Sequence, residues 1–158
     1  MKAYLSLGSN IGDRRSWLRE AVSSLDGVQA VSPVYETDPV GGPPGQQRYL
    51  NIVVELDTAL TPRQLLGVCH RLESAANRVR DERWGPRTLD VDILWHDAGP
   101  IDEPDLQIPH PRMFERRFVM APLADLLTGS ADDLRRRLLP EAWEDHAEGR
   151  VDQVGSLY

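Results

Sequence analysis

The sequence predicts an α+β fold in which helices pack on a ferredoxin-like β-α-β-β-α-β sheet, followed by a C-terminal helical extension. Three observations lead to this prediction. Four short segments have strand-like apolar patterns, two longer segments have helical period, and a capping signal precedes each of those two helices. With 158 residues, of which 41% are hydrophobic, the chain is expected to form a single domain over residues 1–158.

The first half of the pattern is strand, helix and strand. Residues 2–7 are predicted to form the first strand, and Gly8-Ser9-Asn10 is expected to be only a tight turn. Residues 10–13 can cap a helix, whose apolar residues recur with helical period up to Leu25. Residues 28–37 alternate loosely and are predicted to form a strand, in which Pro33 indicates an edge or a bulge.

The second half begins with a loop over residues 38–47, which is rich in proline and glycine and is expected to be functional. Residues 49–56 are predicted to form a strand. Thr61-Pro62-Arg63-Gln64 is a capping box with proline at the first helical position. The helix is expected to end at Asn77, because asparagine tolerates the left-handed conformation that is common at helix ends.

The remaining segments are a charged loop over residues 78–88, a strand over residues 89–95 and a short irregular stretch. Residues 122–127 are predicted to form a helical turn that begins at a proline. Ser130 can cap a last helix through Leu139. Residues 129–158 are expected to be a C-terminal extension of the domain.

The composition excludes several classes of function. No stretch approaches the ~20 apolar residues of a membrane helix, and the N-terminal apolar run is too short for a signal peptide. The net charge of −7 argues against a nucleic-acid surface. The single cysteine, Cys69, cannot form an internal disulfide, which predicts a cytoplasmic protein with a small buried thiol. Neither a membrane nor a nucleic-acid partner is expected.

Positive charge is carried almost entirely by arginine, since Lys2 is the only lysine among 18 basic residues. Two basic islands, residues 78–88 and 110–118, suit a compact polyanion better than a long one. The sequence has no lysine of the P-loop type. If the chain handles a nucleoside triphosphate, arginines and a metal ion must do so.

The most informative segment is Arg83-Trp84-Gly85-Pro86-Arg87-Thr88-Leu89-Asp90-Val91-Asp92. Asp90 and Asp92 are two residues apart in a predicted strand, so their side chains are expected on one face. Adjacent carboxylates suit Mg²⁺, which proteins usually hold with one or two carboxylates and the phosphates of a substrate. The upstream arginines suit phosphate oxygens.

Tyr49 and Asn51 share a strand face by the same rule. A ring beside an amide suits a flat heterocycle, because the ring can stack and the amide can pair with the heterocycle's edge. Tyr49 alone is also simply a favourable strand residue.

Structural interpretations remain open for other candidates. A D-x-D pair also occurs in nucleotide-sugar transferases, or its acids could pair with arginines on an exposed strand. Arg80 and Arg83 could belong to a solvated run of charges. His110 lies between two prolines, and a lone histidine is more often structural than catalytic. Glu73 could form a salt bridge to an arginine such as Arg78.

Residues 83–92 resemble the signature of the 6-hydroxymethyl-7,8-dihydropterin pyrophosphokinase family. Further similar segments follow one another in order along the chain, up to about Thr128. They are residues 7–10, 35–39, 49–51, 73, 78–80, 108–112, 115–116 and 118–123.

The resemblance implies a monomeric diphosphotransferase of folate biosynthesis, which moves pyrophosphate from ATP to 6-hydroxymethyl-7,8-dihydropterin and releases AMP. It implies two Mg²⁺ ions held by Asp90, Asp92 and ATP, with Arg78 and Arg87 as further catalytic residues. The ATP contacts it implies are Glu73, Arg80, Arg83, Trp84, Arg87, His110 and Arg116. The pterin contacts it implies are Thr37, Asp38, Pro39, Val40, Tyr49, Asn51 and Phe118.

Four positions depart from the family pattern, namely His70, Asn77, Asp105 and Gln107, so ATP affinity is less predictable than the chemistry. A non-catalytic nucleotide- or pterin-binding regulator on the same scaffold would be expected to lose an acidic ligand, yet both acids are present. A nucleotide-sugar transferase would need a longer chain and a larger nucleotide domain. The sequence therefore favours the pyrophosphokinase over the regulator and the nucleotide-sugar transferase.

Overall fold

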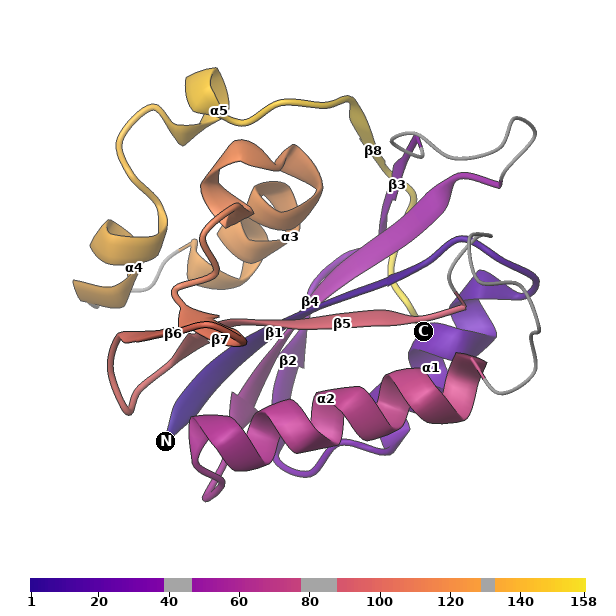
Figure 1. Ribbon diagram of the computed structural model, residues 1–158. Coiled ribbons are helices and arrows are strands. Elements are labelled where there is room, and N and C mark those ends of the chain that lie inside the picture. The colour runs from indigo at the N-terminus through magenta and orange to yellow at the C-terminus, as the bar shows by residue number, and fades with distance from the viewer. Residues whose placement is uncertain (39–46, 78–87, 129–132) are drawn as a thin grey trace.

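The computed structural model describes residues 1–38, 47–77, 88–128 and 133–158. In these ranges the chain forms a mixed α/β fold, in which a six-stranded antiparallel sheet carries helices on both sides and a two-stranded sheet lies beside it (Figure 1). The elements, in chain order, are β1 (Lys2–Ser9), α1 (Arg14–Ser23), β2 (Val28–Val31), β3 (Tyr35–Thr37), β4 (Tyr49–Asp57), α2 (Pro62–Asn77), β5 (Asp90–His96), β6 (Ile101–Glu103), β7 (Leu106–Ile108), the 3₁₀ helix η1 (Met113–Glu115), α3 (Arg117–Leu127), α4 (Asp133–Leu138), α5 (Trp143–His146) and β8 (Val151–Gln153).

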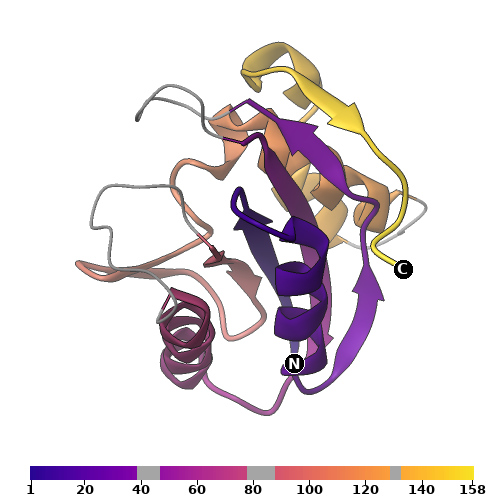
Figure 2. The same ribbon diagram turned by 90° about the vertical axis from the view of Figure 1, so that its right-hand side faces the viewer.

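The large sheet has the strand order β5-β1-β4-β3-β8, and β2 also pairs with β4. Helices α1 and α2 lie on one side of the sheet and α3 lies on the other (Figures 1 and 2). The central strands β1 and β4 are almost entirely buried, as expected for strands covered on both faces. The β5 strand is at one end of this order, where the His110 amide donates to the Leu94 carbonyl at 3.2 Å.

The two predicted capping signals are confirmed. The Asp13 side chain accepts a hydrogen bond from the Ser16 amide at 3.1 Å, and α1 begins at Arg14, directly after Asp13. Thr61 and Gln64 form a reciprocal capping box, in which each side chain accepts from the other residue's amide, at 3.2 and 2.9 Å. Each cap satisfies amides that the first turn of a helix leaves without partners.

Cys69 is fully buried in α2, as predicted, and burial raises the pKa of its thiol to about 12. Glu73 and Asp92, which lie nearby, raise this pKa further. The cysteine is therefore a small core residue and not a nucleophile. The cytoplasmic location inferred from the single cysteine stays a prediction.

Two predictions for the first half of the chain were wrong in detail. Residues 28–37 form two strands, β2 and β3, because the chain breaks around Pro33, which has no amide to donate to a ladder. Gly8 and Ser9 are not in a turn but end β1, where Gly8 pairs with Asn51 on one side and with Asp90 on the other. This second correction matters for the site.

The stretch after residue 95 is not irregular, since β6 and β7 form an antiparallel hairpin. The helical turn predicted over residues 122–127 is the second half of α3, and Pro122 lies inside that helix. A proline is most favourable in the first turn of a helix, which is why the sequence indicates a helix start at Pro122.

The C-terminal extension is not only helical. After α4 and α5, β8 pairs with β3 and joins the main sheet (Figure 2). Residues 129–132, which include the predicted cap Ser130, lie outside the described residues. Within the described ranges, no helix is both long enough and apolar enough to cross a membrane.

Candidate active site

Strand register brings the predicted site residues onto one face of the sheet. In the ladder, Gly8 of β1 is opposite Asn51 of β4 and also opposite Asp90 of β5. Residues directly opposite one another in antiparallel strands point to the same face. Asn51 and Asp90 therefore flank Gly8, which has no side chain to fill the space between them.

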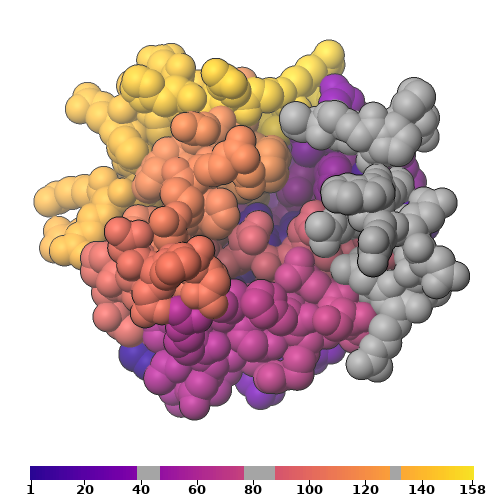
Figure 3. Space-filling view, in the orientation of Figure 1, coloured from indigo at the N-terminus to yellow at the C-terminus, as the bar shows by residue number. Residues whose placement is uncertain are grey.

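A cavity of about 680 Å³ lies on this face; we call it the face cavity. It is lined by Ser6, Gly8, Thr37, Asp38, Tyr49, Asn51, Asp90, Asp92, Arg112, Glu115, Arg116, Phe118, Glu148, Gly149 and Arg150. The space-filling view shows the molecule hollowed between α2 and α3 (Figure 3).

A second cavity, of about 290 Å³, lies beside β5; we call it the edge cavity, because β5 is at one end of the sheet. It is lined by β5, α2, the β6–β7 hairpin and the segment that follows β7. Its lining is Leu66, His70, Glu73, Val91, Asp92, Ile93, Pro104, Asp105, Leu106, Gln107, His110 and Pro111. Asp92 lines both cavities, so the two cavities adjoin at this residue.

Asp90 and Asp92 both line the face cavity, as their spacing predicts. Asp90 is half-buried and Asp92 is exposed, so Asp92 keeps access to solvent and to ligands. Among the described residues, no group of three or more histidines, cysteines, aspartates or glutamates could hold a metal ion by itself. Two carboxylates fit Mg²⁺ where water and substrate phosphates supply the remaining oxygens.

The Asn51 side chain is buried, with 4% of its surface exposed. Its Nδ2 has no hydrogen-bond partner within the described part of the chain. A buried amide donor without a partner costs folding free energy, so an acceptor on a ligand would satisfy it. Tyr49, two residues earlier, lines the same cavity.

Phe118 and Arg116 face the same cavity from the start of α3. The Arg116 guanidinium carbon lies 5.6 Å from the centre of the Phe118 ring, which is a cation–π distance. The ring predicted for the pterin and the arginine predicted for ATP are therefore neighbours.

The edge cavity collects the remaining described candidates for ATP contact, Glu73 and His110. Three of the four residues that depart from the family pattern also line it, namely His70, Asp105 and Gln107, and the last two have hydrogen-bond partners. Arg63 holds the Asp105 carboxylate with two hydrogen bonds of 2.7 and 2.8 Å, which lower the pKa of Asp105. Gln107 donates to Asp102 at 3.2 Å.

Several predicted residues lie outside the described residues, and their roles stay predictions. They are Pro39, Val40, Arg78, Arg80, Arg83, Trp84 and Arg87.

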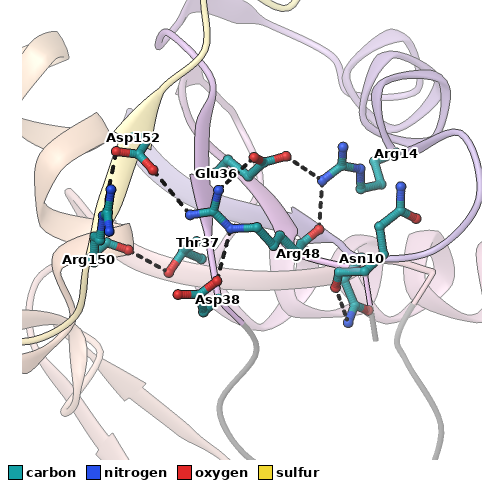
Figure 4. A network of polar contacts seen from close by, with 9 residues as sticks. Asn10, Arg14, Glu36, Thr37, Asp38, Arg48, Arg150 and Asp152 are labelled. Carbon is teal, nitrogen blue, oxygen red and sulfur yellow. Dashed lines mark hydrogen bonds and ion pairs between the residues drawn. The ribbon is translucent and has the colours of Figure 1, made fainter. Parts of the chain in front are cut away.

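An ion-pair network beside the face cavity joins β3, β8 and the start of β4 (Figure 4). Arg48 contacts three carboxylates, those of Glu36 at 2.9 Å, Asp38 at 3.0 Å and Asp152 at 3.2 Å. Arg14 also binds Glu36, at 2.8 Å. The network therefore fixes Asp38, which lines the cavity, relative to two strands.

The sequence analysis missed a set of residues that the face cavity contains: Ser6, Gly8, Arg112, Glu115, Glu148, Gly149 and Arg150. Gly8 had a detectable signal, because a glycine inside a strand pattern often marks a close approach of other groups. Residues 148–150 had no local signal, since only tertiary contacts bring them to the cavity.

We expect His110 to titrate below its usual pKa of about 6.5 in the ligand-free protein. Burial is the main cause of the lowered pKa; Asp92 opposes it, and Arg116 and Arg112 add to it. The Nδ1 atom accepts a hydrogen bond from the Arg112 amide at 3.2 Å, which places the proton of the neutral ring on Nε2.

The titration also has a consequence for stability. The unfolded chain binds this proton more readily than the folded protein does. The contribution of the neutral His110 ring to the unfolding free energy is therefore fully present above about pH 6.5, and it is lost as the pH falls below that value. NMR titration of the ring protons, with His110→Gln to assign the signal among four histidines, measures the midpoint. A midpoint at or above 6.5 would contradict the assignment.

The chain is similar to known proteins of one family. The model of the family described as 7,8-dihydro-6-hydroxymethylpterin-pyrophosphokinase (HPPK) matches residues 4–128. The chain is 49% identical over 129 residues to the 2-amino-4-hydroxy-6-hydroxymethyldihydropteridine pyrophosphokinase of Bacillus subtilis, which covers 78% of this chain and 77% of the relative. It is 44% identical over 148 residues to the protein of the same name from Pseudomonas aeruginosa, with 89% and 88% covered.

A crystal structure of HPPK-DHPS from Plasmodium falciparum has a similar fold, with a TM-score of 0.62 at 13% identity. The match covers 97% of this chain but only 46% of that longer protein, and at this identity it supports the fold alone. The family assignment rests on the sequence matches, which span most of the chain. This chain belongs to the 7,8-dihydro-6-hydroxymethylpterin-pyrophosphokinase family.

Proposed function

We propose that the face cavity and the edge cavity together form the site where this chain transfers pyrophosphate from ATP to 6-hydroxymethyl-7,8-dihydropterin. The enzyme is a transferase of folate biosynthesis, and ATP is its co-substrate. One observation carries the assignment of the site. The row Asn51, Gly8, Asp90 places an unpaired amide donor and a carboxylate on one sheet face, with only a glycine between them.

The pterin is assigned to the part of the face cavity lined by Thr37, Asp38, Tyr49, Asn51 and Phe118. The Asn51 amide supplies a donor for the edge of the heterocycle, and the two rings supply surfaces for stacking. Pro39 and Val40 are proposed as further contacts on the strength of the family resemblance alone.

The triphosphate is assigned to the region where the two cavities meet, with Glu73 and His110 on the nucleotide side. Asp90 and Asp92 would hold Mg²⁺ there together with phosphate oxygens, and two ions are proposed. Bound Mg²⁺ would neutralise charge on the triphosphate and keep the phosphate chain in one orientation. Arg116, with Arg78, Arg80, Arg83, Trp84 and Arg87, is proposed to contact the nucleotide.

The reaction requires attack by the pterin hydroxyl oxygen on the β-phosphorus of ATP. The new bond joins that oxygen to the β-phosphorus, the bond from the β-phosphorus to the α–β bridging oxygen breaks, AMP leaves with that oxygen, and the hydroxyl proton is released to water. The chain contributes mainly by positioning, as in other phosphoryl transfers. Asp92 lines both cavities, which supports a position for it beside the point of attack.

The predicted organisation is also part of the proposal. The order β5-β1-β4 followed by β2 and β3, with α1 and α2 on one side, supports a ferredoxin-like arrangement. The pairing of β8 with β3 supports a single domain over residues 1–158. A monomer is proposed as the working unit on the strength of the family resemblance alone.

Product analysis tests the proposed function. With Mg²⁺, ATP and 6-hydroxymethyl-7,8-dihydropterin, we expect AMP and the pterin diphosphate in equal amounts. Stoichiometric ADP would show transfer of the γ-phosphoryl group instead. ATP consumption that does not depend on the pterin would exclude the proposed reaction.

A further inference from the structure

We propose that residues 147–150, here called the strap, complete the pterin end of the face cavity, and that Arg117 is the positioning residue that holds them. This inference rests on the proposed function for where the pterin binds. The strap lies beyond residue 128, where the family match ends. It nevertheless supplies three residues to the cavity lining, Glu148, Gly149 and Arg150.

The strap is tied to the protein on both sides of the cavity. On one side, the Glu148 amide donates to the Glu115 carbonyl at 2.8 Å, and the Arg117 amide donates to the Glu148 carbonyl at 3.0 Å. On the other side, the Thr37 hydroxyl donates to the Arg150 carbonyl at 3.1 Å. The strap therefore crosses from the start of α3 to β3, where β8 begins.

The Arg117 side chain makes three further contacts with this segment. Its guanidinium donates to the carbonyls of Glu144, Ala147 and Gly149, at 2.8, 2.6 and 3.0 Å. Hydrogen bonds from a charged donor are stronger than neutral ones, and the planar guanidinium presents its donors in a rigid arrangement. One side chain thus fixes the backbone just before and within the strap.

The position of the strap predicts which substrate depends on it. Thr37, which the strap contacts directly, and Tyr49 and Asn51 line the face cavity and do not line the edge cavity. Loosening the strap should therefore weaken pterin binding and leave nucleotide binding unchanged. A purely structural role for Arg117 would affect both substrates through loss of folded protein.

The chain offers a matched control for Arg117. Arg15 holds the same C-terminal segment in the same way, donating to the carbonyls of Ser156 and Val154 at 2.6 and 2.9 Å. Neither of those residues lines the face cavity. Arg15→Ala therefore removes a similar clamp at a distance from the substrates.

Two glycines give a second, independent pair of a test variant and a matched control. Gly149 in the strap has φ +104° and Gly155 beyond β8 has φ +98°, and an added Cβ would meet nothing within 4 Å at either position. Alanine is strained at such φ values, so both substitutions perturb the local backbone without a clash. Only Gly149 lies in the strap.

The experiment measures binding of the pterin in the presence of Mg²⁺ and a non-hydrolysable ATP analogue, and binding of the analogue alone, by calorimetry. Arg117→Ala and Gly149→Ala should each weaken pterin binding on the order of tenfold, with the analogue's affinity unchanged. Arg15→Ala and Gly155→Ala should leave pterin affinity as in the wild type. Hydrogen exchange at residues 147–150 should accelerate in Arg117→Ala and Gly149→Ala, and it should be unchanged in Arg15→Ala and Gly155→Ala.

Three outcomes would overturn the proposal. One is wild-type pterin affinity in Arg117→Ala or Gly149→Ala with accelerated exchange in the strap. Another is a loss of pterin affinity in Arg15→Ala and Gly155→Ala that equals the loss in Arg117→Ala and Gly149→Ala. The third is a loss of affinity for the ATP analogue in Arg117→Ala and Gly149→Ala as large as their loss of pterin affinity. If one variant does not fold, the other decides. Failure of the proposed function is distinguishable, because the wild-type protein would then not bind the pterin at all.

Discussion

Asp92→Asn is expected to lower kcat/KM on the order of a thousandfold, because a metal ion at a phosphoryl-transfer site supplies several kcal/mol of stabilisation. The amide keeps the shape of the side chain but loses the charge that would hold Mg²⁺. Asp90→Asn should have a similar effect. Asp92 should be the more sensitive position, because it alone of the two also lines the edge cavity.

The fold should tolerate both changes. Asp92 is exposed, so it incurs little desolvation cost, and its loss should change the unfolding free energy by less than about 0.5 kcal/mol. Glu55→Gln is the control, since Glu55 is on the same sheet, accepts from the Tyr4 hydroxyl at 2.6 Å and lines neither cavity. Near-normal turnover by Asp90→Asn or Asp92→Asn at ordinary Mg²⁺ concentration would remove the metal assignment.

Local rules explain what the sequence could predict. Side-chain direction in a strand repeats every two residues, so the pairs Asp90 with Asp92 and Tyr49 with Asn51 could each be placed on one face without knowing the fold. Helix caps are equally local, and both predicted caps are present. None of these rules depends on which strands are neighbours.

The arrangement of the site depends on tertiary register and so could not be predicted. Nothing local indicates that Gly8 pairs with both Asn51 and Asp90, because that requires β1 to lie between β4 and β5. The strap reaches the cavity because β8 pairs with β3 and because Glu148 bonds to the backbone of Glu115 and Arg117. By contrast, the β6–β7 hairpin had a partial signal, since Pro104 and Asp105 are turn-forming residues and the alternating Leu106-Gln107-Ile108 follows them.

Asn51→Ala is the second substitution with a large expected effect. Loss of the buried amide should weaken pterin binding by about 1–3 kcal/mol, or roughly ten- to a hundredfold. The unfolding free energy should change by less than about 1 kcal/mol, because Nδ2 has no partner in the described protein and its removal breaks no hydrogen bond there. Calorimetry with the pterin and chemical denaturation measure the two quantities.

Val53→Ala is the control on the same strand and should behave in the opposite way. Val53 is fully buried and does not line either cavity, so its truncation should destabilise the fold by roughly 1–3 kcal/mol and leave pterin affinity unchanged. If Asn51→Ala instead destabilises the fold as Val53→Ala does, with normal pterin affinity, Asn51 is a structural residue.

Gly8→Ala tests the same contact without removing the amide. A Cβ on Gly8 would lie 2.8 Å from Asn51 Oδ1, so the amide must move away from its present position. We expect roughly tenfold weaker pterin binding, because a displaced donor loses most of a net hydrogen-bond contribution. Gly67→Ala is the control, since its Cβ would make only an ordinary 3.6 Å contact with Arg71 and should stabilise α2 by about 0.5–1 kcal/mol. Normal pterin affinity in Gly8→Ala would show that the position of the Asn51 amide does not matter, and the pterin would then have to bind elsewhere in the cavity.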